Sequence, residues 1–258
     1  QPHPPRRTNR PDVPRTSARR RLESHLEKII YLVWKPANIS DVDFRDQLTG
    51  ETAEQILASG AHKLSVLCPD ETTEALAPAS ITQVDSPYCG MVSAWVDLAD
   101  DRAPIESAIA RVTEKMAGYL VVESVPTVNT THTAPEGERT PGTTLLTCLT
   151  PLPDMTISAF FKHWFEVQRR VATETQCTYL YIRNVVVQKL TADAPDYVGI
   201  VEEGFPTPAV TDPMLWYKAD GSEEKMKKNL GKMMESVQGF LDLSKIESRP
   251  TSEYIIKG

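Results

Sequence analysis

Two stretches of the sequence alternate polar or aromatic residues with aliphatic ones, and their polar members could carry proton-transfer chemistry. In the segment 178–187, Tyr179, Tyr181 and Arg183 alternate with the aliphatic Leu180 and Ile182. In the segment 198–203, Glu202 follows the aliphatic Val201. Successive strand residues point to opposite faces, so we expect the aliphatic residues to face helices and the four polar or aromatic ones to line one apolar cavity. Glu202 would then act as a base and Tyr181 would donate a hydrogen bond to an oxyanion. Arg183 would pair with a substrate carboxylate.

A third strand should contribute to the same cavity. In the segment 90–98, Val92, Ala94 and Val96 alternate with Ser93 and Trp95. We expect the first three to face helices and the last two to point into the cavity, where an indole ring could stack on a planar aromatic substrate. The predicted catalytic residues are Glu202, Tyr181 and Arg183, and the predicted substrate contacts include Tyr179, Ser93 and Trp95. The alternative is that Arg183 and Glu202 form a buried ion pair with a structural role only.

The histidines and glycines give no support for a metal or a nucleotide. His163 is predicted on the solvent side of its helix, and His62 at the head of a strand. No two histidines or cysteines have the spacing of metal ligands. Gly199 and Gly204 bracket a predicted strand, whereas a phosphate-binding loop opens a helix. We therefore expect no metal and no cofactor.

The composition is that of a globular protein with a sizeable core. The 258 residues are 40% hydrophobic and 24% charged, and no apolar run approaches the 20 or so residues that span a bilayer. The four cysteines lie far apart in sequence, which favours buried free thiols in a reducing cytoplasm.

Residues 1–21 differ from the rest of the chain. They hold seven arginines against a single acid, Asp12, with five prolines and few residues that could pack. We expect a disordered basic extension. The net charge of this extension is +6 and that of the whole chain is −7, so residues 22–258 carry −13. Such an acidic body argues against nucleic acid as a partner.

The candidate residues are positioned by a helix and the strand that follows it. Residues recur at helical spacing in the segment 156–172 and form an apolar and aromatic stripe, namely Ile157, Phe160, Phe161, Trp164, Gln168 and Val171. A short link at 174–176 connects this helix to the predicted strand at 178–187. We therefore expect this helix to pack on one face of the strand.

The order strand, helix, strand, strand, helix, strand occurs twice, as in ferredoxin-like domains. DSPYCG at 85–90 resembles DAPDYVG at 193–199, and the spacing from Phe44 to Leu48 matches that from Phe160 to Trp164. We infer an internal duplication: a first repeat at 22–128, a linker at 129–141 and a second repeat at 142–258. The predicted fold class is α+β, with two ferredoxin-like (βαββαβ) repeats whose sheets face each other in a barrel with helices outside.

The second repeat resembles a known family. The segments FFKHWFEVQRRVA, YLYIRN, DYVGIVEE and GFLDLSKIESRPTSEYIIKG occur in the order found in the EthD group of the dimeric α+β barrel superfamily. The resemblance covers about the last 115 residues, and the first repeat is similar to a degenerate second copy. Members of this group usually pair two chains to close one barrel, so the chain resembles a version with both halves fused.

The resemblance implies a small-molecule site in which Trp164 and Gln168 contact the substrate. The family's helix motif has a histidine four residues after the tryptophan, where this chain has Gln168, and an amide does not titrate. The function implied is a cofactor-free lyase, decarboxylase or isomerase for a small aromatic or polyketide-like compound. The alternative is a non-catalytic binding or accessory protein of a catabolic pathway. The expected partner is a small aromatic or hydrophobic molecule, with no nucleic acid and no membrane, and the chain is expected to be a monomer or a homodimer.

Overall fold

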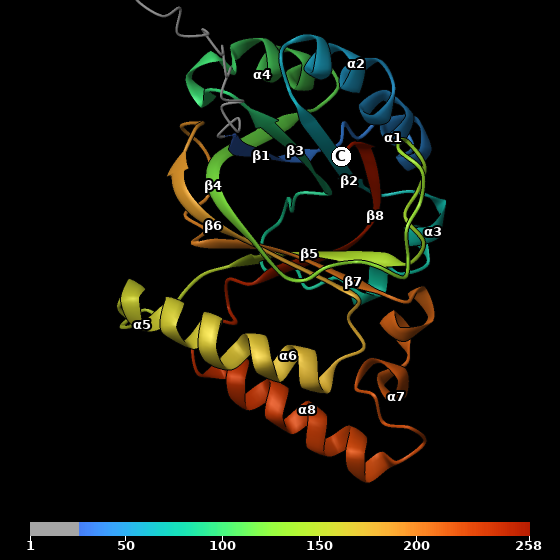
Figure 1. Cartoon of the computed structure of the whole chain (residues 1–258), viewed down its shortest axis with the longest axis vertical. Coiled ribbons are helices and arrows are strands. Elements are labelled where there is room, and N and C mark those ends of the chain that lie inside the picture. The colour runs from blue at the N-terminus through green and yellow to red at the C-terminus, as the bar shows by residue number, and fades with distance from the viewer. Residues whose placement is uncertain (1–25) are drawn as a thin grey trace, which may run out of the picture.

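The computed structural model describes residues 26–258 and has a mixed α+β fold built on a closed antiparallel barrel (Figure 1). The predicted basic extension at 1–21 lies outside the described residues. The barrel has eight strands: β1 (Glu27–Trp34), β2 (Lys63–Cys68), β3 (Gly90–Val96), β4 (Lys115–Thr127), β5 (Thr143–Leu149), β6 (Leu180–Lys189), β7 (Gly199–Phe205) and β8 (Glu247–Lys257).

Helices of the two halves cover opposite sides of the barrel, as Figure 1 shows for α1, α2 and α4 on one side and α5, α6 and α8 on the other. Their bounds are α1 (Asp41–Thr49), α2 (Glu51–Ala58), α3 (Glu71–Glu74), α4 (Ala103–Ala110), α5 (Ile157–Lys162), α6 (Arg169–Thr175), α7 (Pro213–Trp216) and α8 (Glu223–Gln238). A π-helical turn at His163–Gln168 joins α5 to α6, and short 3₁₀ turns occupy Ala77–Ala79, Ala99–Asp101 and Thr207–Thr211. None of the helices in residues 26–258 is long and apolar enough to cross a membrane.

The strands follow the same order in both halves. Around the barrel the sequence is β1-β3-β2-β8-β5-β7-β6-β4, and β4 returns to β1. In each half the first strand therefore lies between the fourth and the third. Two seams join the halves: β2 pairs with β8, and β4 pairs with β6. Because both seams are antiparallel and hydrogen-bonded, the barrel leaves no open strand edge.

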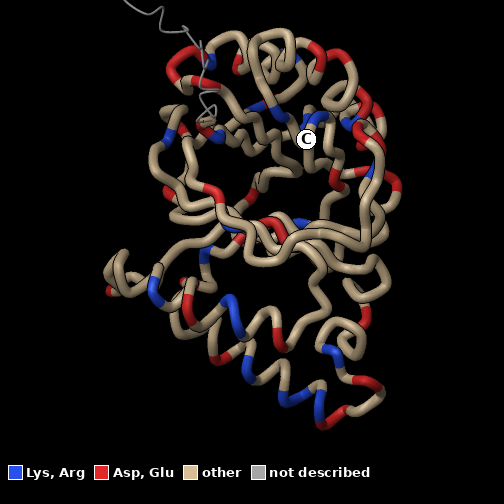
Figure 2. Tube along the Cα trace, viewed as in Figure 1, with Lys and Arg blue, Asp and Glu red and all other residues tan. Residues whose placement is uncertain are grey.

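Local sequence signals set the helix boundaries. The side chain of Ser40 accepts a hydrogen bond from the backbone N–H of Asp43 and begins α1. Gly50 lies between α1 and α2, where a glycine in the sequence predicts a break in the helix. Ser222 caps α8, whose first turn carries two acids and whose following turns carry lysines (Figure 2). These signals fix where each helix starts against the barrel.

Three hydrophobic clusters correspond to three layers. The first lies between the sheet of the first half and its helices, the second fills one end of the barrel interior, and the third lies between the sheet of the second half and α5, α6 and α8. The barrel interior is thus apolar at one end as well as on its outer faces. Alternation alone consequently does not tell which face of a strand looks inward.

Some predicted boundaries were wrong. Apolar residues at helical spacing predict a helix over 102–116, but α4 ends at Ala110 and Met116 lies on β4. The sequence pattern also predicts a strand at 119–125, and β4 is longer than that at both ends. The final strand begins at Glu247 rather than Glu253. Ile157, expected in the apolar stripe of its helix, is 50% exposed. These are differences at element ends, where neighbouring strands extend pairing beyond the local pattern.

Candidate functional site

A cavity of about 380 Å³ lies between the outer face of the second-half sheet and the helices that cover it. Its floor comes from β5, β6 and β7, and its roof from the helix 157–175 and from α8. The first half contributes Ile81 from the loop between β2 and β3. Its lining includes Trp164, Gln168, Gln176, Tyr181, Glu203 and Met233.

Tyr181 faces this cavity rather than the barrel interior, which corrects the predicted orientation of β6. Tyr181 packs in the third hydrophobic cluster, whereas Asn184, three residues further along β6, points into the barrel, where it binds Lys28 and Glu202. Leu180 and Ile182 share the inward face with Asn184. The prediction rested on the aliphatic residues packing against helices. Asn184, a polar residue on that supposedly helix-facing side, was the signal against it.

Glu203 is the acidic residue in the lining of the cavity, and the alternation of residues on its strand does not single it out. Its half-buried side chain lies next to Tyr181, because the two residues are register partners on β7 and β6. Burial raises its pKa from the ordinary 4.5 to about 7. The same alternation that sends Glu202 inward sends Glu203 toward an apolar helix stripe. A carboxyl on the helix-facing side of a strand is unusual, and this feature of the sequence could have identified Glu203 as a candidate.

Tyr181 and Trp164 are joined across the cavity floor. The indole Nε1 donates a hydrogen bond of 3.0 Å to the phenol oxygen. Burial and the nearby charge of Glu203 raise the pKa of Tyr181 well above its ordinary value, so the phenol stays protonated. The indole ring lies directly on Gly199, where a Cβ atom would come within 2.5 Å of the ring. Glycine at the start of β7 therefore lets Trp164 lie flat against the sheet.

The π-helical turn presents Trp164 and Gln168 to the cavity. Such a turn widens a helix by one residue and occurs frequently at functional sites. The Gln168 amide donates from Nε2 to the sulfur of Met233 at 3.3 Å, while its Oε1 is buried and has no partner among residues 26–258. A buried acceptor without a partner is destabilising, so a ligand with a hydroxyl donor would satisfy it.

Glu202 points into the barrel as predicted, but its partner is not Arg183. Lys28 donates to Glu202 at 3.2 Å, to Asn184 at 2.8 Å and to Glu123 at 2.6 Å, and its ammonium lies 4.6 Å from the ring centre of Trp95. The Glu202 side chain is almost completely buried and also accepts from Asn184 at 2.9 Å. This group of side chains joins strands β1, β4, β6 and β7.

The remaining predicted site residues lie in three different places. Ser93 points into the barrel as expected, and its hydroxyl is buried without a partner among the described residues. Arg183, predicted to line the barrel, instead faces outward: its guanidinium lies 4.4 Å from the ring centre of Phe165 and its Nε donates to Ser124 at 3.2 Å. Tyr179 donates its hydroxyl to the carbonyl of Pro141 at 2.9 Å, away from the cavity. Of the eight predicted residues, the structure brings Tyr181, Trp164 and Gln168 together.

His163 does not face open solvent, contrary to the prediction. Its ring stacks on Phe240 with the centres 4.8 Å apart, and Nε2 lies 3.3 Å from the hydroxyl of Ser236 on α8. Because Phe240 lines the cavity, His163 supports the cavity wall from behind. The close approach of α8 to this helix, which no local pattern encodes, gives the histidine its partners.

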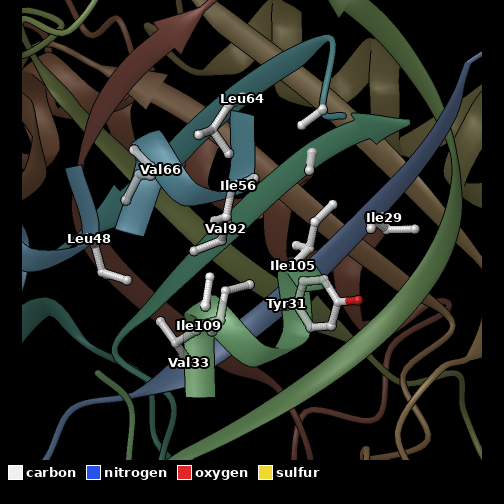
Figure 3. Close-up of a cluster of buried hydrophobic side chains, with 14 of the residues drawn as sticks. Ile29, Tyr31, Val33, Leu48, Ile56, Leu64, Val66, Val92, Ile105 and Ile109 are labelled. Carbon is white, nitrogen blue, oxygen red and sulfur yellow. The ribbon is translucent and has the colours of Figure 1, made fainter. Parts of the chain in front are cut away.

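The equivalent layer of the first half is filled by side chains. Figure 3 shows residues of its strands and helices pointing toward one another, among them Leu48, Ile56, Val92 and Ile109. Aligning Gly90 with Gly199 places Ala94 where the second half has Glu203. Leu48 likewise corresponds to Trp164. Aliphatic packing therefore replaces the polar cavity groups in the first half.

Comparisons with known proteins bear on the fold. No protein-family model matches the chain, and no curated protein matches it. Among solved structures, an anthrone oxidase-like protein is similar with a TM-score of 0.53 and 10% sequence identity, over 92% of this chain and 95% of that one. A monooxygenase-like protein from Lactobacillus acidophilus NCFM is similar with a TM-score of 0.48 and 9% identity, over 90% of this chain and 96% of that one. The chain therefore has the α+β barrel fold of the anthrone oxidase-like protein over nearly its whole described length.

Proposed function

We propose that the protein is a cofactor-free enzyme that moves a proton on a small aromatic or polyketide-like compound held in the second-half cavity. Glu203 is its acid–base group. The observation that carries the proposal is a carboxyl with a pKa of about 7, raised by burial, in a cavity lined mainly by apolar side chains. A base is most effective when its pKa lies near the working pH.

The chemistry is proton abstraction next to a carbonyl. The Glu203 carboxylate takes a proton from a carbon acid, and the electron pair moves to the carbonyl oxygen. Returning the proton at another carbon gives an isomer. In a decarboxylation, the protonated Glu203 instead delivers its proton to the carbanion that remains after CO₂ leaves. Trp164 provides a flat apolar surface for the ring, and the Gln168 amide is placed to hydrogen-bond a polar substituent.

Two features of the solved relative and of the sequence support this substrate class. The anthrone oxidase-like protein shares the fold, and an anthrone is a planar aromatic ketone with acidic hydrogens. The sequence motifs of the second half resemble the EthD group. We infer that the chain is a fused pair of ferredoxin-like repeats, at 22–128 and 142–258, with the catalytic role kept by the second.

The second candidate is a binding protein without turnover. It is favoured by Gln168, which cannot titrate, and by the Tyr181 hydroxyl, which already accepts from Trp164. Glu203 would then serve only to orient a bound ligand. The two candidates differ in whether a proton is transferred.

Proton exchange on anthrone distinguishes them. The protein is incubated with anthrone in D₂O, and the loss of the methylene hydrogens is followed by ¹H NMR, with mass analysis for oxidation or loss of CO₂ from a panel of aromatic acids. The enzyme should accelerate exchange above the buffer rate, and Glu203→Gln should bring the rate back to it while anthrone still quenches tryptophan fluorescence. Binding with no acceleration by the wild-type protein would favour the binding protein.

A further inference from the structure

A second cavity adjoins the first. It measures about 320 Å³ and lies beneath α7 and the turn Thr207–Thr211. The two cavities share five wall residues, namely Ile81, Leu145, Gln176, Trp216 and Ser248. Because the same side chains border both spaces, the cavities are two compartments of one groove.

Gln176 stands where the compartments meet. It follows the last residue of α6 and turns the chain toward β6, with its backbone N–H donating to the carbonyl of Ala172 at 2.9 Å. The residue is only 7% exposed, and its side chain borders both cavities. A glutamine amide has N–H donors and an oxygen acceptor, so at this junction it can hydrogen-bond a ligand oxygen or hydroxyl that lies across both compartments.

The second compartment is built to hold an apolar group. Trp216 forms one wall and is held by stacking on Phe205, with the ring centres 3.8 Å apart. Ala209, Val210 and Pro213 add apolar surface on the other side. Each compartment alone is near the lower limit for a ligand site of about 300–1,000 Å³, and a molecule that occupies both would be enclosed more completely.

We propose that the natural substrate is an elongated aromatic ketone that spans both compartments. This rests on the proposed function for the end that lies beside Glu203. One ring occupies the first compartment, the carbonyl oxygen accepts a hydrogen bond from the Gln176 amide at the junction, and a second ring or acyl arm lies beneath α7. Gln176 is the residue that selects for the central oxygen, and the second compartment selects for length.

Three probes separate these contributions by affinity, measured by isothermal titration or by quenching of tryptophan fluorescence. Acetophenone has one ring and a ketone, chalcone adds a second ring beyond the ketone, and trans-stilbene has two rings without the oxygen. We expect chalcone to bind at least tenfold more tightly than either. Gln176→Leu should remove the preference for chalcone over stilbene, because one hydrogen bond of about 1.4 kcal/mol corresponds to a tenfold change.

Val210→Trp should fill the second compartment and reduce chalcone affinity at least tenfold while leaving acetophenone binding unchanged. Val122→Trp is the control, because Val122 is exposed on β4 and lies outside both compartments. Thr211→Trp, at an exposed position of the same compartment, replaces Val210→Trp if that variant loses its native circular dichroism.

The outcomes separate the two proposals. Equal affinity for chalcone and acetophenone, or chalcone binding that neither tryptophan substitution weakens, overturns the two-compartment substrate and leaves Glu203 chemistry in place. A chalcone preference that survives Gln176→Leu overturns the assigned role of the amide. If anthrone, acetophenone and chalcone all fail to bind, both the groove and the proposed function are wrong.

Discussion

Glu202 and Glu203 are neighbours with the same chemistry and opposite surroundings. The first is bonded to Lys28 inside the barrel, and the second lines an apolar cavity. Replacing each with glutamine makes the same chemical change on the two faces of one strand. The pair therefore provides a matched test at the scale of single residues.

Glu203→Gln should lower turnover by a factor of about 10² or more, the usual contribution of a general base, and leave the fold intact. Glu202→Gln should leave specific activity normal and lower the free energy of unfolding by about 1–3 kcal/mol, because the buried Lys28 loses one of its two carboxylate partners and keeps Glu123. Urea denaturation and the anthrone exchange rate measure the two effects. Activity lost in Glu202→Gln and retained in Glu203→Gln would reverse the assignment.

The pH dependence of stability should also report on Glu203. Its pKa in the folded protein, about 7, lies above the ordinary 4.5, so the folded protein binds this proton more tightly than the unfolded chain does. Stability from this group is complete below pH 4.5 and is lost as the pH rises to 7, by up to about 3 kcal/mol. Glu203→Gln removes the effect.

Thermal unfolding at pH 4.5 and pH 8 tests this directly. The variant should equal the wild-type protein at the lower pH and exceed it in melting temperature at the higher one. Glu253, whose pKa is raised to about 6 by burial, contributes with the same sign in both proteins and cancels in the comparison. A constant difference across this range would mean that the Glu203 carboxyl is not buried. The profile of kcat/KM should in turn rise with pH through about 7.

At the scale of elements, β7 and the helix before α6 must approach closely. Gly199→Ala places a methyl group within 2.5 Å of the Trp164 ring and should destabilise the fold by about 1–3 kcal/mol. It should also weaken binding of anthrone, because the indole must move. Gly231→Ala is the control: nothing lies within 4 Å of its added Cβ atom, and alanine favours the interior of α8 by about 0.5–1 kcal/mol. Equal stability of the two variants in urea would contradict the close packing of Trp164.

Element order and caps could be predicted from the sequence, but the facing of β6 could not. Ser40, Gly50 and Ser222 act through local hydrogen bonds and backbone conformation, which a short segment encodes. The inward face of a strand is set by what covers it. Here the barrel interior at one end is as apolar as the helix layer, so Tyr181 and Leu180 could each have faced either side. For β7, the apolar Val201 was correctly predicted to face the helices and the charged Glu202 to face the barrel interior.

The candidate site was predicted only in part for a related reason. Trp164 and Gln168 follow from the helix stripe, whereas Gln176 and Glu203 gain their importance from α7 and α8, which pack onto them from later in the chain. Long-range packing of this kind has no signature in the spacing of nearby residues.

At the scale of the whole molecule, Lys28 connects the halves through the barrel interior. Its partners lie on β4, β6 and β7, so three acceptors from both halves depend on one ammonium group. Lys28→Met should lower the free energy of unfolding by about 3–5 kcal/mol, because the buried Glu202 carboxylate loses its cation. Lys189→Met is the matched control, since Lys189 pairs with the exposed Asp196 at 2.6 Å and should change stability by no more than about 1 kcal/mol. The denaturant midpoint should fall strongly for the first variant alone.

Ile81 and Ser248 exchange two backbone hydrogen bonds, each of 2.9 Å, and so hold a loop of the first half onto β8. Both residues also border the groove, so a bound ligand would contact the two residues that form this bridge. Occupancy of a site that lies almost wholly in one half is thereby coupled to local opening in the other. At a ligand concentration of 100 times Kd, the bridge should open about a hundredfold less often, and the deuterium uptake of these two amides should slow to match. Ligand binding in the second half would therefore reduce local opening in the first half, whose own helix layer is filled by side chains.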